Sequence, residues 1–267
     1  MQWADTLFIN PGMIALDTMG QAVFPYLAFN ATAQFDQHNY FSRVEPGTSL
    51  QLTIMNLDSI AHNILIDEGM FSTGVLLPGQ TSTIDFGVLP NGIYGVRDSL
   101  ELNRFLGLST FFVVWPESKE CFYWHLNEHQ SDWNADIRNG VTIDTEEYTP
   151  DYFSINDRVH PQIMSDTLAS VTGKVNDSIL IFVQNSGRMA HSIHFHGYHV
   201  EVLYSNGNAL DIGREKDTIP VKPGKGQVYL LVPFQPGIFP VHDHNLISTT
   251  GGGNFPSGMM VMMNIGL

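Results

Sequence analysis

The chain has 267 residues, enough for one large or two medium domains that each bury a proper core. Hydrophobic residues make up 43% and charged residues 15% of the chain, which is typical of a globular protein with rather few surface charges. Its 12 Lys and Arg against 27 Asp and Glu give a net charge of −15, and this argues against binding to nucleic acid, because too few cations are available to displace phosphate counterions.

Cys121 is the only cysteine, which excludes an internal disulfide framework and a metal site made of several thiolates. A site for a soft metal must therefore use His and Met. The start, MQWADTLFINPGM, has no basic segment followed by an apolar run, so it does not resemble a secretory signal. No stretch approaches the roughly 20 apolar residues of a spanning helix, so we expect no membrane span. The sequence does not distinguish a cytosolic protein from one whose leader has been removed.

The chain carries few helix signals and many strand signals. Short runs rich in β-branched and aromatic residues are separated by Pro, Gly, Asn and Asp, a spacing typical of an all-β sandwich. In chain order the runs are SLQLTIMNL (49–57), STIDFGVL (82–89), STFFVVW (109–115), SILIFVQN (178–185), QVYLLVPF (227–234) and GMMVMMNI (258–265). Before the third run, SLELNRFLGL (99–108) is the best candidate for a short helix.

The chain also repeats itself. The order strand, Asn, turn, His, strand occurs in residues 45–67 and again in residues 174–197, at an offset of 129 (191 − 62). A second match, at an offset of 145 (243 − 98), follows a Pro-Gly turn in each copy. The matched residues are Asn56 with Asn185, His62 with His191, Pro78-Gly79 with Pro223-Gly224, and Asp98 with Asp243. Two copies of one β-sandwich explain this pattern most simply.

The repeat predicts two domains and a connection. We expect a first domain over residues 1–118, an inter-domain strand and linker over 119–150, and a second domain over 151–267. The copies differ in their histidines. Where the second copy has His194, His196, His242 and His244, the first has Leu65, Asp67, Arg97 and Ser99. Shared positions should maintain the fold, so positions that are histidine in one copy only are candidates for a site.

Two His-x-His pairs make up this candidate site. His194 and His196 alternate along a strand, so their side chains point to one face, and His242 and His244 do the same on another strand. Four imidazoles brought together are a common ligand set for copper or zinc. The alternative is that these histidines only cap strand ends or line a polar rim. Their absence from the first copy favours metal binding.

Several segments resemble the last cupredoxin domain of multicopper oxidases. They are YFSINDRVHP, AHSIHFHGYHVEVL, KPGKGQVYLLVPFQPGIFPVHDH and NFPSGMMVMMNI. The segment ECFYWHLNEHQSDWN resembles the inter-domain strand of two-domain and multi-domain members of that group. The resemblance covers residues 152–267 well and residues 45–115 more weakly. It implies an all-β fold of two tandem cupredoxin-like Greek-key β-sandwiches with copper as the cofactor.

The resemblance also assigns residues to copper centres. His194 matches a type 2 ligand. The type 3 ligands are matched by His196, His242 and His244. His191 matches the first type 1 histidine and Met259 the axial methionine, which makes them, with Asp243, further metal candidates. Asp243, however, stands where the family has its type 1 cysteine, and the later type 1 histidine falls near Ser248. A blue copper site is therefore not expected, because its thiolate donor is missing.

The ligand count leaves several functions open. The trinuclear cluster of the family takes His-x-His pairs from two domains, and the first domain here has none. We expect either a copper-binding oxidoreductase that acts on a small molecule or metal ion, or a non-catalytic copper-binding or structural cupredoxin protein acting in an assembly. A purely structural, metal-free sandwich is the third class. The resemblance further implies a homo-oligomer, with a trimer favoured, and a periplasmic or extracellular location.

Three other histidines are assigned to packing. His125 and His129 stand four residues apart, but the aromatic residues around them favour an extended strand over a helical metal face. His199 is expected to pack in the core or at the rim of the second domain.

Overall fold

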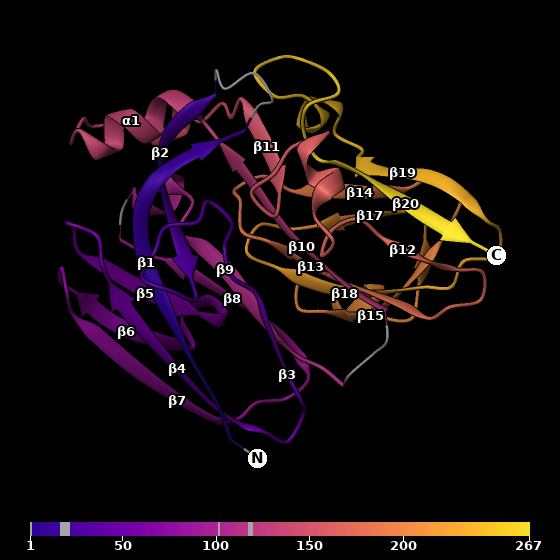
Figure 1. Cartoon of the computed structure of the whole chain (residues 1–267), viewed down its shortest axis with the longest axis horizontal. Helices are drawn as coiled ribbons and strands as arrows, with labels where there is room; N and C mark the ends of the chain where they lie inside the picture. The colour runs from indigo at the N-terminus through magenta and orange to yellow at the C-terminus, as the bar shows by residue number, and fades with distance from the viewer. Residues whose placement is uncertain (1, 17–21, 101, 117–119) are drawn as a thin grey trace. The chain divides into compact units, whose positions relative to one another are not determined.

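The computed structural model describes residues 2–16, 22–100, 102–116 and 120–267, and it contains two compact units (Figure 1). Of the described residues, 2–15, 22–100, 102–116 and 129–150 belong to the first unit, and 16, 120–128 and 151–267 belong to the second. The segment 119–150, expected as a connection, is thus divided between the two units. Both units consist mainly of β-strands, which confirms the all-β fold class.

The first unit is a sandwich of two sheets. One has the strand order β2-β1-β4-β7 and the other β3-β9-β8-β5-β6. The strands are β1 (Gln2–Ala15), β2 (Val23–Asn30), β3 (Ser42–Val44), β4 (Ser49–Asn56), β5 (His62–Ile66), β6 (Phe71–Leu76), β7 (Thr81–Val88), β8 (Gly92–Asp98) and β9 (Ser109–Val114). Strand β4 alternates half-buried and buried residues, so its apolar side chains Leu50, Leu52 and Ile54 all enter the core between the sheets.

The second unit is a sandwich of two larger sheets, with orders β11-β10-β13-β18-β15-β16 and β12-β20-β19-β14-β17. The strands are β10 (Glu120–His129), β11 (Tyr152–Ile155), β12 (Thr172–Lys174), β13 (Ile179–Asn185), β14 (His191–Phe195), β15 (Val200–Ser205), β16 (Glu215–Lys216), β17 (Thr218–Val221), β18 (Gly226–Leu231), β19 (Gly237–Asp243) and β20 (Met260–Gly266). Strand β13 lies between two neighbours and is buried along its whole length, which explains its continuous apolar run.

Helices are short in both units. One α-helix, α1 (Ser131–Arg138), belongs to the first unit and was not expected from the sequence. The 3₁₀ helices are η1 (Asp67–Gly69), η2 (Asn103–Leu106), η3 (Thr145–Glu147), η4 (Gln162–Ser165), η5 (Ala209–Asp211) and η6 (Leu246–Thr249). Within the helix expected at 99–108, only residues 103–106 are helical, and position 101 lies outside the described residues. No helix among the described residues has the length and apolarity that a membrane crossing requires.

The internal repeat extends to the hydrogen-bonding register. In the first unit β5 pairs antiparallel with β8, which places Leu65 opposite Arg97. In the second unit β14 pairs antiparallel with β19, which places His194 opposite His242. These residues match at the offsets of 129 and 145 found in the sequence. The two strand pairs are therefore the same structural element. One histidine is matched in both copies, as His62 and His191, whereas the His-x-His pairs occur only in the second unit.

Candidate metal centre

The four histidines predicted as metal ligands lie together on one sheet of the second unit. His194 is on β14 and His196 follows its last residue, while His242 is on β19 and His244 follows that strand. Because side chains alternate along a strand, each pair points to the same face, and the register brings the two pairs side by side. His194 and His242 are half-buried, whereas His196 and His244 are exposed. We call these residues the four-histidine cluster.

Ring contacts connect the whole cluster. The ring centre of His194 lies 4.7 Å from that of His196 and 5.6 Å from those of both His242 and His244. The rings of His196 and His242 are 5.1 Å apart, and their Nε2 atoms are separated by 3.0 Å. Two imidazole nitrogens bound to one metal at about 2.0 Å each are separated by roughly 3 Å, so this pair is spaced as two ligands of one ion.

Two rings of the cluster, those of His194 and His242, are held by hydrogen bonds at Nδ1. Nδ1 of His194 lies 2.8 Å from Oγ1 of Thr218, and Nδ1 of His242 lies 2.8 Å from the carbonyl oxygen of Asp243. With Nδ1 engaged, Nε2 of His242 faces His196, and Nε2 of His194 is left available as a donor, as in metal-bound histidines that have second-shell partners. Across the described residues, no group of three or more His, Cys, Asp or Glu side chains is already arranged to hold a metal ion. Four imidazoles are nonetheless donors that copper accepts, so the chemistry of the donor set fits copper although the rings are not arranged around one ion.

The charge state of His196 also suits a metal. Burial and the neighbouring imidazoles of His194 and His242 lower the pKa of His196. Its ring is therefore more readily neutral, and only a neutral imidazole offers a lone pair to a metal.

The position of the type 1 copper holds a different structure. His191 is fully buried between two carboxylates, with Nδ1 at 2.7 Å from Oδ2 of Asp243 and Nε2 at 3.1 Å from Oε2 of Glu128. Burial lowers the pKa of His191, but the bonds to Asp243 and Glu128 outweigh it and raise the pKa to about 9. The bond to His191 in turn lowers the pKa of Asp243 against the effect of burial. We call these three residues the carboxylate–histidine cluster.

This cluster does not fit a type 1 copper. Both ring nitrogens of the protonated His191 carry hydrogens directed at carboxylates, so neither offers a lone pair. Met259 is buried and Ser248 is buried with no hydrogen-bond partner for its Oγ among the described residues. Cys121 is on β10. The further candidates His191, Asp243 and Met259 thus lack the thiolate and the free imidazole that such a site requires.

The first unit has a matching buried cluster and no imidazoles beside it. Nδ1 of His62 lies 2.5 Å from Oδ2 of Asp98, and Nε2 lies 3.3 Å from Oδ2 of Asp58. Arg138 of α1 donates two hydrogen bonds to Asp58, at 2.6 and 2.9 Å. Although burial opposes it, the bonds from His62 and Arg138 hold the pKa of Asp58 well below its usual range. Asp58 and Glu128 were not identified from the sequence.

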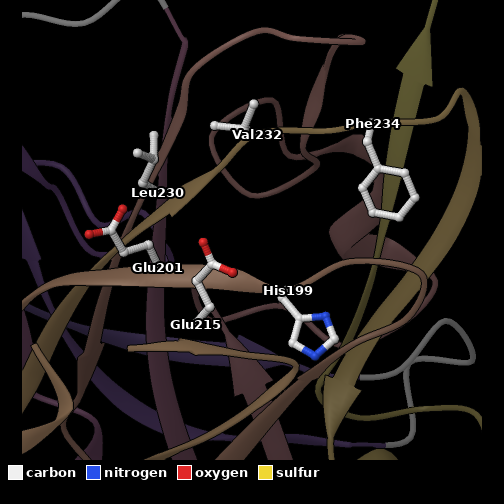
Figure 2. Close-up of a pocket in the computed structure, with 6 residues that line it drawn as sticks. All are labelled: His199, Glu201, Glu215, Leu230, Val232 and Phe234. Carbon is white, nitrogen blue, oxygen red and sulfur yellow. The ribbon is translucent and has the colours of Figure 1, made fainter. Parts of the chain in front are cut away.

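The other histidines serve packing or line a surface cavity. His125 and His129 lie on strand β10, as the extended interpretation predicted, and both are buried. Nε2 of His125 is 2.8 Å from Oγ of Ser186. His199 is exposed and lines a cavity of about 270 Å³ together with Glu201, Glu215, Leu230, Val232 and Phe234 (Figure 2). Packing in the core or at the rim was expected for His199, and its exposed side chain excludes a place in the core.

Comparisons with known proteins agree with this architecture. Residues 132–263 match the family model described as multicopper oxidase. A blue copper oxidase from Nitrosomonas europaea is similar in structure, with a TM-score of 0.83, 21% identity, and coverage of 99% of this chain and 86% of that one. A Cu-containing nitrite reductase from Thermus scotoductus has a TM-score of 0.76 and 18% identity, covering 100% and 62%.

A laccase from Botrytis aclada is similar at lower identity, 12%, with a TM-score of 0.74 and coverage of 98% of this chain and 52% of that one. No curated protein matches the sequence significantly. At these identities the structural matches show the fold, and the family model covers the part of the chain that carries the four-histidine cluster. Residues 132–263 therefore match a multicopper oxidase domain, and the whole chain has the fold of the multicopper oxidases and copper nitrite reductases that it resembles.

Proposed function

We propose that this protein binds copper through the four-histidine cluster of its second unit. The observation that carries the proposal is the 3.0 Å separation between Nε2 of His196 and Nε2 of His242, with His194 and His244 beside them. Copper in such a site would supply one-electron redox chemistry. The chain's own residues would hold the ion, and Thr218 would orient His194 through its ring Nδ1.

An oxidoreductase is the first candidate activity. The cluster includes two exposed histidines, so a small oxidisable molecule or a metal ion has access to it. The family relationship supports this reading, because the domain that carries the cluster matches the multicopper oxidase model.

The second candidate is a non-catalytic copper-binding protein that acts in an assembly. It is favoured by the carboxylate–histidine cluster, which stands where the family has the copper that accepts electrons from a substrate. With His191 bonded to Asp243 and Glu128, this chain has no thiolate relay from that position to the four-histidine cluster.

Assembly and location complete the proposal. The four-histidine cluster supplies about half of the imidazoles of a trinuclear centre, and this shortage supports a homo-oligomer, most simply a trimer, in which further ligands come from another copy. A periplasmic or extracellular location fits the family.

Metal analysis with electron paramagnetic resonance on protein purified without chelator tests copper binding. Replacing His194 and His244 by Ala should abolish tight binding, whereas the control His199→Ala, an exposed histidine of the same unit, should not change it. Equal loss in both variants would exclude the four-histidine cluster as the site. Oxygen consumption with a phenol or a reduced metal ion then separates the two candidates, because only the oxidoreductase turns over.

A further inference from the structure

Glu128 connects three strands of the second unit through His191. Glu128 is on β10, His191 begins β14, and Asp243 ends β19. All three side chains have no solvent-exposed surface. The imidazole between two carboxylates thus joins strands of both sheets.

The second oxygen of each carboxylate accepts hydrogen bonds from backbone N–H groups near the four-histidine cluster. Oε1 of Glu128 accepts hydrogen bonds from the backbone N–H groups of Arg188 and Met189, which lead into β14. Oδ1 of Asp243 accepts from the N–H groups of Ser192 and Asn245, at 2.9 and 3.1 Å. The carboxylate–histidine cluster therefore fixes the chain on both sides of the candidate ligands.

The pairing of β14 with β19 carries this constraint to the four-histidine cluster. Asp243 stands opposite Ile193, one residue along from the pair His194 and His242. Side chains alternate along β19, so Asp243 points into the core while its neighbour His242 points to the four-histidine cluster. A shift of Asp243 along the strand would move His242 and His244 with it.

The two units build this cluster from different residues. In the repeat, Asp58 of the first unit corresponds to Gly187 of the second, at the offset of 129 (187 − 58). Asp58 supplies the carboxylate for His62, whereas Glu128 supplies it for His191. Glu128 occupies the space next to Gly187, because a Cβ at that glycine would lie 1.7 Å from Oε2 of Glu128. The arrangement is thus kept in both units although its third member comes from another strand.

We propose that Glu128 is a positioning residue, which acts through His191 and Asp243 to fix the geometry of the four-histidine cluster. The inference rests on the proposed copper binding by that cluster. Glu128 is bonded to His191, so its effect on the four-histidine cluster is exerted through that residue.

The test compares Glu128→Gln with a matched control, Asp58→Asn, which makes the equivalent change in the first unit. We expect Glu128→Gln to weaken copper binding about 10-fold or more, the usual effect of losing an outer-shell partner, and to change the copper hyperfine splitting. Asp58→Asn should leave both unchanged. Wild-type affinity and spectrum in a folded Glu128→Gln variant would overturn the proposal.

If the Glu128→Gln variant does not fold, a second variant that restores the carboxylate tests the proposal. The double substitution Glu128→Ala with Gly187→Asp moves the carboxylate to the position it has in the first unit, and it should restore copper affinity and spectrum. A folded double variant with an altered copper spectrum would contradict a positioning role.

Hydrogen exchange on the metal-free protein separates this inference from the proposed function. In Glu128→Gln, the amides of residues 192–196 and 242–245 should exchange faster, and the double substitution should reverse the change. If the wild type binds no copper, the proposed function fails, and unchanged exchange in the variant would then also reject the inference.

Discussion

The imidazole of His191 and the carboxylate of Asp243 form a fully buried ion pair, with 2.7 Å between Nδ1 and Oδ2. The first unit repeats this pair as His62 and Asp98, at 2.5 Å. A buried charge is costly unless it is paired and hydrogen-bonded, and each of these histidines has two carboxylate partners. The buried pair is therefore common to both copies of the fold, and the four-histidine cluster is present in one copy only.

The loss of the thiolate predicts the optical spectrum. Asp243 stands in the position of the type 1 cysteine, and its carboxylate is bonded to His191. Copper-loaded protein should therefore lack the intense blue colour that a copper–thiolate bond produces. Visible absorption during copper titration checks this. A strong blue band would mean that copper reaches Cys121, and the variant Cys121→Ser would then remove it.

The pKa of His191 predicts how stability depends on pH. Its folded pKa of about 9 is raised above the ordinary value of 6.5, so protonation favours the folded state. The stabilisation is complete below about pH 6.5, is lost as pH rises through about 9, and amounts to a few kcal/mol. The lowered pKa of Asp243 acts at the acidic end, where its contribution is lost as pH falls below its ordinary value of 3.8.

Urea unfolding of metal-free protein at pH 6 to 10 measures this dependence. The variant His191→Gln should unfold at lower urea concentration at pH 6 and show a smaller fall in the free energy of unfolding toward pH 10. A fall of the same size in the variant and the wild type would assign the dependence to other groups, of which His62, whose pKa is also raised, is the first to examine.

Arg138 should stabilise the first unit through Asp58. Its guanidinium makes two hydrogen bonds to a carboxylate with no exposed surface, and α1 carries it. Arg138→Gln should lower the free energy of unfolding by about 2 kcal/mol, the magnitude expected for hydrogen bonds to a charged group. The control Lys222→Gln removes one positive charge from an exposed position and should have little effect. Chemical denaturation of both variants tests the difference.

Gly258 is predicted not to tolerate even the added methyl group of an alanine. A Cβ at this position would lie 2.3 Å from the carbonyl oxygen of Ser248, and backbone cannot yield as a flexible side chain can. Gly258→Ala should therefore destabilise the protein by about 1–3 kcal/mol. Gly266→Ala is the control, because its nearest contact would be 3.8 Å away. Similar melting temperatures for the two variants would contradict this close packing.

Much of the candidate site follows from the sequence because it depends on local patterns. Alternation along strands places His194 with His196 and His242 with His244, and the repeat shows that these histidines occur in one copy only. Both patterns act over short ranges or are copied within the chain. The strand at 120–129 follows from its aromatic residues in the same way.

The parts that the sequence did not predict depend on long-range contacts. Glu128 lies 63 residues before His191, in a segment interpreted only as a connection, so no local pattern links the two. A clue does exist, because Gly187 stands at the repeat position of Asp58 and leaves the second histidine without its local carboxylate. Helix α1 was missed because it spans only eight residues and has no side-chain cap.

The last prediction concerns metal content and assembly. Type 2 and type 3 coppers of the family share about eight imidazoles, because each copper needs two or three neutral nitrogens. The second unit supplies four, and the equivalent positions of the first unit hold Leu65, Asp67, Arg97 and Ser99. If another copy presents its first unit to the four-histidine cluster, Arg97 cannot ligate copper, because its guanidinium stays charged.

We therefore expect an oligomer, most simply a trimer, that holds one or two copper ions per chain and no complete trinuclear cluster. Native mass spectrometry with metal counting measures both quantities on the same sample. Replacing His194 and His244 by Ala should remove the copper, and the control His199→Ala should keep it, so that the counted ions are assigned to the four-histidine cluster. Three coppers per chain would contradict the ligand count, and a monomer that binds copper tightly would show that one second unit suffices.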